Sequence, residues 1–212
     1  MAEIIVQSMV VGDMMTNCYF IQNPKTREML LVDPGEYASA ICRKVSDMQG
    51  VVVAILLTHG HFDHIMALEA VRRQFGCDVY AEEHEKEVLA DPEKNLTGYF
   101  GAPLSVRADH YLKDGEELSL AGFRIQVIYT PGHTIGGCCY YFPDEKILLS
   151  GDTLFAGSCG RVDFPTSSQT QMMDSLRRLL TDLPEDVSVY PGHNMATTIR
   201  DEREYNPYAP RS

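Results

Sequence analysis

The sequence predicts a mixed α/β protein with two β-rich halves, each closed by helices. Alternating or continuous apolar runs, separated by Gly, Asn and Pro, mark strands in both halves of the chain. Apolar residues at helical spacing mark helices between and after these runs. The chain has 212 residues, of which 44% are hydrophobic and 23% charged, which is ordinary for a globular protein with a substantial core. We therefore expect a single domain over residues 1–212, with two packed sheets and helices outside them.

The first half is expected to open with three strands that are joined by turns. The helix after them ends before Gly50, a residue typical of helix C-termini. The run "VVVAILL" is mostly β-branched and indicates a strand that is buried on both faces. We expect strands at residues 3–11, 17–23, 29–35, 51–57 and 77–81, and helices at residues 37–49, 65–75 and 82–90.

The second half is expected to be β-rich and to close with two helices. It follows residues 91–110, the least regular part of the chain. The last helix is stopped by Asn206 and Pro207. We expect strands at residues 116–122, 123–130, 137–143, 146–152 and 187–192, and helices at residues 168–183 and 195–205.

Charge and hydropathy argue against two classes of partner. The net charge of -12 argues against nucleic acid, because phosphate binding depends on clustered Lys and Arg. No segment approaches the roughly 20 apolar residues of a membrane helix, so no membrane partner is expected. The N-terminus carries Glu3 and no basic region, unlike a signal peptide. We therefore expect a cytoplasmic location.

The six cysteines are expected to be reduced thiols rather than disulfides. They show no C-x-x-C spacing, and the cytoplasmic expectation favours reduced thiols. Cys138 and Cys139 are adjacent in a strand-like run, so they should point to opposite faces of a sheet. The histidines are therefore the candidates for metal binding.

Three histidines and an aspartate crowd into the stretch "THGHFDH" between a predicted strand and a predicted helix. These residues are His59, His61, Asp63 and His64. A solvated loop would explain one or two of the histidines, and a helix N-cap would explain the aspartate. Neither explanation accounts for the three imidazoles together. The stretch therefore predicts metal binding.

Further candidate ligands follow other predicted strands. His133 ends "IYTPGH", His193 ends "VYPGH" and Asp152 ends "LLSGD". A tight turn after a strand places such a side chain just beyond the sheet edge. His84 and His110 lack this context, and we expect both to be surface residues.

Seven candidate ligands are too many for one tetrahedral zinc ion, but they suit two ions that share a carboxylate. Nitrogen and oxygen ligands without cysteine favour zinc, with iron or manganese as alternatives. Two such ions can bridge a hydroxide and lower its pKa towards neutrality. Two dications, two aspartates and a hydroxide leave roughly one positive charge, so an anionic substrate becomes acceptable despite the acidic chain.

The motif set resembles the metallo-β-lactamase superfamily. It comprises H-x-H-x-D-H, His after "TPG", Asp after "LSG" and His after "YPG". The most similar branch is that of the type II glyoxalases, or hydroxyacylglutathione hydrolases, which "GDTLFAGSCGRVDFP" and "EREYNPY" also resemble. The resemblance covers nearly the whole chain. It implies a four-layer αββα sandwich.

The resemblance also implies ligand roles and a reaction. His59, His61 and His133 would hold the first ion, and Asp63, His64 and His193 the second. Asp152 would bridge the two ions and, with Asp63, act in catalysis with the bridging hydroxide. The family reaction is hydrolysis of a small anionic thioester such as S-lactoylglutathione. Type II glyoxalases continue into a helical extension that binds glutathione, whereas this sequence ends at Ser212, so the resemblance carries over the metal site but not those contacts.

Other members of the fold offer alternative functions. Persulfide dioxygenases resemble the chain in part and bind one iron, which His59, His133 and Asp152 would hold here. The presence of His64 and His193 favours two metals instead. Lactone or phosphodiester hydrolysis and a catalytically inactive metal-binding domain are weaker alternatives.

Three residues are candidates for substrate contact. Arg161 in "CGRVDFP" could meet a substrate carboxylate, although a buried pair with Asp163 is the favoured interpretation. Tyr99 and Phe100 lie between Gly98 and Gly101 and could form a mobile lip over the site. Packing among loop aromatics is the alternative for this pair.

Overall fold

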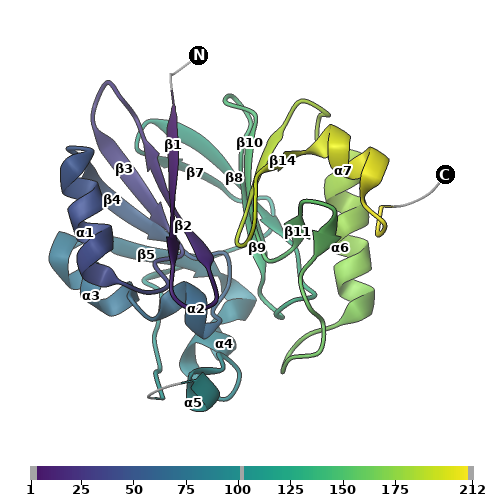
Figure 1. The fold of residues 1–212 in the computed structure, drawn as a ribbon, viewed down its shortest axis with the longest axis horizontal. Helices are drawn as coiled ribbons and strands as arrows, with labels where there is room; N and C mark the ends of the chain where they lie inside the picture. The colour runs from purple at the N-terminus through teal and green to yellow at the C-terminus, as the bar shows by residue number, and fades with distance from the viewer. Residues whose placement is uncertain (1–3, 101–102, 210–212) are drawn as a thin grey trace.

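The computed structural model of the chain describes residues 4–100 and 103–209. Two six-stranded sheets pack against each other, and helices cover the outer face of each (Figure 1). α1 and α3 lie against the sheet that contains β1, and α6 and α7 lie at the opposite side of the molecule. The expected αββα sandwich is confirmed.

The first sheet has the order β1-β2-β3-β4-β5-β6. β1, β2 and β3 are antiparallel, whereas β3 to β6 are parallel. The strands are β1 (Ile5–Val11), β2 (Thr16–Gln22), β3 (Glu28–Val32), β4 (Val51–Leu56), β5 (Asp78–Glu82) and β6 (His110–Leu112). The helices of this half are α1 (Ala38–Asp47), α2 (Phe62–Ile65), α3 (Leu68–Phe75), the 3-10 helix η1 (Glu83–Glu85), α4 (Lys86–Ala90) and α5 (Thr97–Phe100).

The second sheet has the order β14-β13-β10-β9-β8-β7. β10 and β13 are parallel, and the other neighbours are antiparallel. The strands are β7 (Glu117–Leu120), β8 (Phe123–Tyr129), β9 (Cys138–Phe142), β10 (Ile147–Gly151), β13 (Ser188–Pro191) and β14 (Thr197–Thr198). A small hairpin of β11 (Leu154–Phe155) and β12 (Ser158–Cys159) follows β10, and the helices are α6 (Gln169–Asp182) and α7 (Ile199–Tyr205).

Three apolar cores fill the spaces between the four layers. Because strand side chains alternate, Ile21 packs between the sheets while its neighbour Phe20 packs on the helix side of the first sheet. In β9, Cys138 faces the space between the sheets and Cys139 faces α6, as the sequence predicts. All six cysteines are free thiols.

The expected helix at residues 65–75 is wrong in its start and its continuity. The helical turn α2 begins at Phe62, and α3 begins only at Leu68. The break occurs because the backbone N–H of Ala67 donates to the carbonyl of Gly35, a residue of the loop after β3. A contact from a distant loop thus overrides the local helical pattern.

Other differences concern short elements. Glu82 ends β5 instead of beginning a helix, and its carboxylate accepts from the N–H of His84 to cap η1. The expected C-terminal helix starts later, at Ile199, after β14. The strands β6, β11 and β12 and the turn α5 were not expected. None of the described helices is both long and apolar enough to cross a membrane.

Candidate metal centre

The seven candidate ligands meet at one edge of the sandwich. The segment after β4 supplies four of them, His59 and His61 from its loop and Asp63 and His64 from the turn α2, and the loops after β8, β10 and β13 supply one each. These strands end at the same edge, since β8 and β10 run in the same direction and β13 is parallel to β10. Chain segments far apart in sequence therefore converge between the two sheets.

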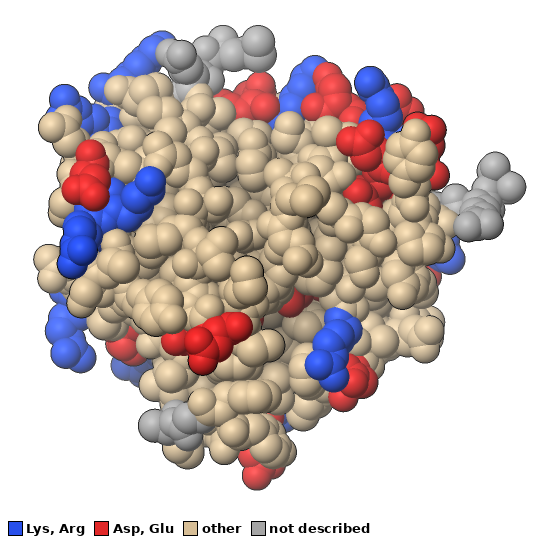
Figure 2. All heavy atoms as spheres, in the orientation of Figure 1, with Lys and Arg blue, Asp and Glu red and all other residues tan. Residues whose placement is uncertain are grey.

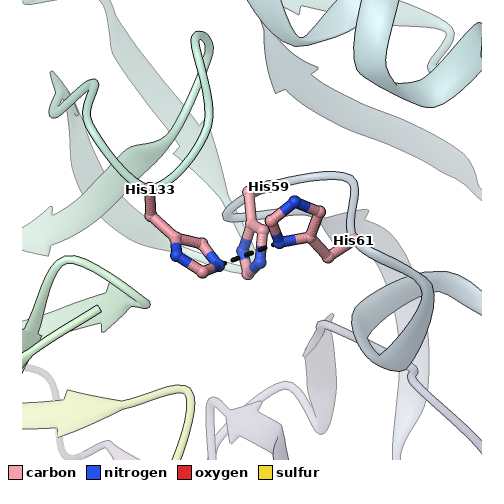
Figure 3. A group of neighbouring side chains, drawn as sticks. All are labelled: His59, His61 and His133. Carbon is pink, nitrogen blue, oxygen red and sulfur yellow. Dashed lines mark hydrogen bonds between the residues drawn. The ribbon is translucent and has the colours of Figure 1, made fainter. Parts of the chain in front are cut away.

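One group of imidazoles consists of His59, His61 and His133. The three rings turn towards one another from two loops (Figure 3). Nδ1 of His61 lies 2.8 Å from Nε2 of His133, and the ring of His59 is 4.9 Å from both other rings. All three residues are buried. One nitrogen from each lies within 4.8 Å of the others, a spacing that could hold one metal ion.

A second group consists of Asp63, His64 and His193. Oδ2 of Asp63 lies 3.5 Å from Nε2 of His64 and 3.3 Å from Nε2 of His193. Asp63 also accepts a hydrogen bond of 2.7 Å from the hydroxyl of Thr16, which orients its carboxylate. This group likewise offers three ligand atoms within 4.8 Å of one another.

Asp152 lies between the two groups. Its Oδ2 is 3.4 Å from Nε2 of His133 and 3.4 Å from Nε2 of His193, and its Oδ1 is 3.6 Å from Nε2 of His64. A carboxylate at this place can reach a ligand position in both groups. The room comes partly from Gly192, where a Cβ atom would lie 2.2 Å from Oδ1 of Asp152.

Several buried polar atoms of the centre lack a hydrogen-bond partner among the described residues. They are Nε2 of His59, Nε2 of His61, Nε2 of His64 and Oδ1 of Asp152. Buried polar atoms are nearly always satisfied, so such a cluster requires an explanation. Metal coordination would satisfy them, and the donor set of imidazoles and carboxylates fits zinc, iron or manganese.

Asp33 is a supporting residue that sequence analysis missed. It lies just after β3, is almost fully buried, and accepts 2.9 Å from Nδ1 of His64. It also accepts from the N–H and the hydroxyl of Thr58. Its bond to Nδ1 leaves Nε2 of His64 free to act as a ligand. The backbone carbonyl of Arg161 does the same for His133, at 2.8 Å from Nδ1.

The two groups differ in the pKa of their imidazoles. Burial and the neighbouring imidazoles lower the pKa of His59 and of His61 well below the ordinary value, and burial lowers that of His133. Burial also acts to lower the pKa of His64, but the charges of Asp63, Asp33 and Asp152 raise it to about 9. Hydrogen bonds to Asp152 and Asp63 likewise overcome burial and raise the pKa of His193 to about 10.

Arg161 pairs with Asp163, the interpretation that the sequence favours, but the pair is exposed rather than buried. Its guanidinium donates 2.8 Å to Oδ2 of Asp163 and lies over the ring of Phe164. The Phe164 ring in turn lies 5.4 Å from that of His61. Arg161 is therefore close to the centre without lining it.

Tyr99 and Phe100 are both exposed on α5. The ring of Phe100 stacks on that of Phe62 at 4.5 Å, which supports packing among loop aromatics for this residue. Gly101, part of the expected lip, lies outside the described residues. His84 and His110 are exposed and bond to Glu82 and Asp78, away from the seven candidate ligands.

Comparisons with known proteins agree with this geometry. Residues 11–193 match the family described as the metallo-beta-lactamase superfamily. A probable metallo-hydrolase of Bacillus subtilis, YqgX, is 36% identical over 202 residues, covering 94% of this chain and 95% of that protein. Hydroxyacylglutathione hydrolase GloC of Haemophilus influenzae is 30% identical over 198 residues, covering 91% of this chain and 92% of that protein.

Two solved structures are similar over almost their whole length. The BLEG-1 B3 metallo-beta-lactamase has a TM-score of 0.90 and 36% identity, covering 96% of this chain and 99% of that one. TTHA1623 in a di-iron-bound form has a TM-score of 0.85 and 30% identity, covering 96% of this chain and 100% of that one. From its fold, its clustered histidines and these matches, the chain belongs to the metallo-β-lactamase superfamily.

Proposed function

We propose that the chain is a hydrolase that binds two divalent metal ions. His59, His61 and His133 would hold one ion, Asp63, His64 and His193 would hold the other, and Asp152 would contribute a carboxylate to both. The observation that carries this assignment is the cluster of buried polar atoms without hydrogen-bond partners, within side-chain groups whose ligand atoms lie within 4.8 Å of one another. The di-iron form of the similar TTHA1623 supports two ions, while zinc suits the donor set equally well.

The ions, when bound, supply a Lewis acid and a water of lowered pKa at neutral pH. The residues of the chain prepare this centre. Asp152 spans the two groups, and Asp63 is oriented by the hydroxyl of Thr16. Asp33 and the Arg161 carbonyl fix the tautomers of His64 and His133, so that the ligand nitrogens face the centre.

The proposed substrate is a small, anionic acyl thioester such as S-lactoylglutathione. The similarity to GloC, a hydroxyacylglutathione hydrolase, supports this substrate class. On the face drawn in Figure 2, an acidic group lies at lower centre, and a basic group lies beside an acidic one at lower right. Positive charge for an anionic substrate would therefore come mainly from the ions, with Arg161 as the neighbouring side chain.

A turnover screen with metal analysis of the same sample tests the proposal. The panel contains S-lactoylglutathione, other acyl thioesters, lactones and a β-lactam, the last because BLEG-1 is a similar B3 metallo-beta-lactamase. We expect two metal equivalents per chain and turnover of a thioester. One iron per chain with oxygen uptake on glutathione persulfide would instead identify a dioxygenase. Turnover confined to the β-lactam or lactone would reject the thioester.

A further inference from the structure

Glu85 is a buried carboxylate that the proposed reaction does not use. It ends η1 and is only 1% exposed. Buried carboxylates are rare unless they are paired, yet no ion pair of the described residues includes Glu85. Burial raises the pKa of its carboxyl to about 7. Burying such a group costs free energy, so its contacts should indicate its role.

Three hydrogen bonds hold the Glu85 carboxylate, and they come from two loops. The N–H of Gly60 donates to Oε1 at 2.6 Å. The N–H of Gly136 donates to Oε2 at 2.8 Å, and the hydroxyl of Thr134 donates to the same oxygen at 3.0 Å. Oε1 thus accepts from the loop after β4, and Oε2 accepts from the loop after β8.

These are the two loops that carry the first group of imidazoles. Gly60 lies between His59 and His61, and Thr134 directly follows His133. Figure 3 shows the three rings meeting from these loops. A single carboxylate therefore joins the two chain segments whose separation sets the distance from His61 to His133.

The glycines that meet Glu85 leave no room for a side chain. A Cβ atom at Gly136 would lie 2.0 Å from the backbone nitrogen of Glu85. A Cβ atom at Gly60 would lie 2.9 Å from a methyl carbon of Leu89 and 3.2 Å from Oε1 of Glu85. Both loops thus approach the glutamate so closely that only glycine fits at these two positions.

We propose that Glu85 is a positioning residue that fixes the loop of His59 and His61 against the loop of His133, and so sets the metal affinity of that group. The inference rests on the proposed metal centre. It predicts a selective effect, because Glu85 contacts Gly60 between His59 and His61 but, among the described residues, has no hydrogen bond to α2, which carries Asp63 and His64, or to the loops of Asp152 and His193.

The test is Zn²⁺ binding to the full chain, measured by competition with a chromophoric chelator. Glu85→Gln keeps the shape but replaces one acceptor oxygen with a donor. We expect one of the two equivalents to bind about 10–100-fold more weakly, the usual cost of losing a group behind a ligand. His133→Ala and His193→Ala identify which equivalent is affected. It should be the one that His133→Ala removes.

Glu202→Gln is a matched control. Glu202 is also buried and also accepts three hydrogen bonds, from Gly157, Thr197 and Asn206. This variant should lower the melting temperature while both zinc equivalents keep wild-type affinity. Equal weakening by Glu202→Gln and Glu85→Gln would reduce Glu85 to a general stabilising residue and overturn the proposal.

Thr134→Val provides a second, milder variant that removes one donor and keeps the shape. It should weaken the same equivalent by less than Glu85→Gln does. Wild-type affinity in both variants, or in Thr134→Val where Glu85→Gln does not fold, overturns the proposal. A wild type that binds a single ion, which Glu85→Gln then weakens, would reject the two-ion function but support the role of Glu85.

Discussion

The two halves of the metal centre use different chemistry to bring similar ligands together. The first group contains three buried imidazoles and no carboxylate of its own, and burial keeps those imidazoles neutral. The second group contains two imidazoles with an aspartate, and its histidines have raised pKa values because aspartates surround them. The residues that hold the ligands in place also differ between the two groups.

Neutral imidazoles can accept a cation without first losing a proton, but beyond the 2.8 Å contact between Nδ1 of His61 and Nε2 of His133 they have no charge attraction to hold them together. Their geometry must therefore be fixed from outside, by the Arg161 carbonyl and by Glu85. In the second group, ion pairs with Asp33, Asp63 and Asp152 hold the protonated histidines in place. The first group is thus held in place by packing and backbone contacts, and the second group is held in place by charge.

Loss of Asp152 should break both halves at once and have the largest effect. Its carboxylate oxygens lie 3.4–3.6 Å from imidazole nitrogens of both groups. Asp152→Ala should abolish hydrolysis, with a loss well above the roughly 100-fold cost of removing an outer partner. It should also remove one metal equivalent, as measured by elemental analysis of the purified variant.

The control for this variant is Asp163→Ala, which removes an exposed aspartate that pairs with Arg161. It should retain two metal equivalents and most of its activity. Wild-type activity in Asp152→Ala would reject the two-metal mechanism.

Loss of Asp33 should weaken mainly the second group, since it reaches the first group only through the Thr58 hydroxyl, which lies 3.2 Å from Nδ1 of His59. Asp33→Asn cannot both accept from Thr58 and balance a proton on His64, whose Nδ1 lies 2.9 Å from the carboxylate. We expect the second ion to bind about 10–100-fold more weakly while the first is less affected. Zinc competition titrations of wild type and variant measure both. Equal weakening of the two ions would show that the groups are not independent.

Among the ligands, metal binding should release protons from the second group alone. With pKa values of about 9 and about 10, His64 and His193 are protonated at pH 7.5 in metal-depleted protein. An imidazole must lose its proton before it can bind metal, so the ligands should release about two protons, to which ionisation of a metal-held water would add up to one more, and affinity should rise with pH up to this range. Calorimetric titration in buffers of different ionisation enthalpy counts the protons.

His64→Gln serves as the control for the proton count, because loss of this ligand should prevent binding of the second ion and with it the release of protons from both histidines. Release of no protons by the wild type would mean that both histidines are neutral before the metal binds. The electrostatic difference between the two groups would then disappear.

Most of the architecture could be predicted from the sequence because it depends on local patterns. Alternating apolar residues place Phe20 and Ile21 in different cores, and strand-turn signals bring His133, Asp152 and His193 to one edge. The break between α2 and α3 could not be predicted, because it depends on a hydrogen bond to the distant Gly35.

The two supporting residues, Asp33 and Glu85, also differ in whether the sequence indicates their role. Asp33 had a usable signal, since it follows a strand in "LLVDPG" much as Asp152 does in "LLSGD". The Asp-Pro-Gly sequence also fits an ordinary turn, so the sequence alone did not identify Asp33 as a supporting residue. Glu85 had none, because it lies in the charged stretch "EEHEKE", and its burial arises only when two distant loops close over it.

Arg161 should matter least, and only for the substrate. Its ion pair with Asp163 is exposed, and such pairs contribute little to stability, so Arg161→Ala should leave the melting temperature and both metal equivalents unchanged. If an anionic thioester contacts the guanidinium, KM should rise severalfold with little change in kcat, and Arg161→Lys should restore part of the loss. Steady-state kinetics on S-lactoylglutathione and on an uncharged thioester separate the outcomes. An equal KM increase for both substrates would assign Arg161 to the packing of Phe164 beside His61 rather than to charge recognition.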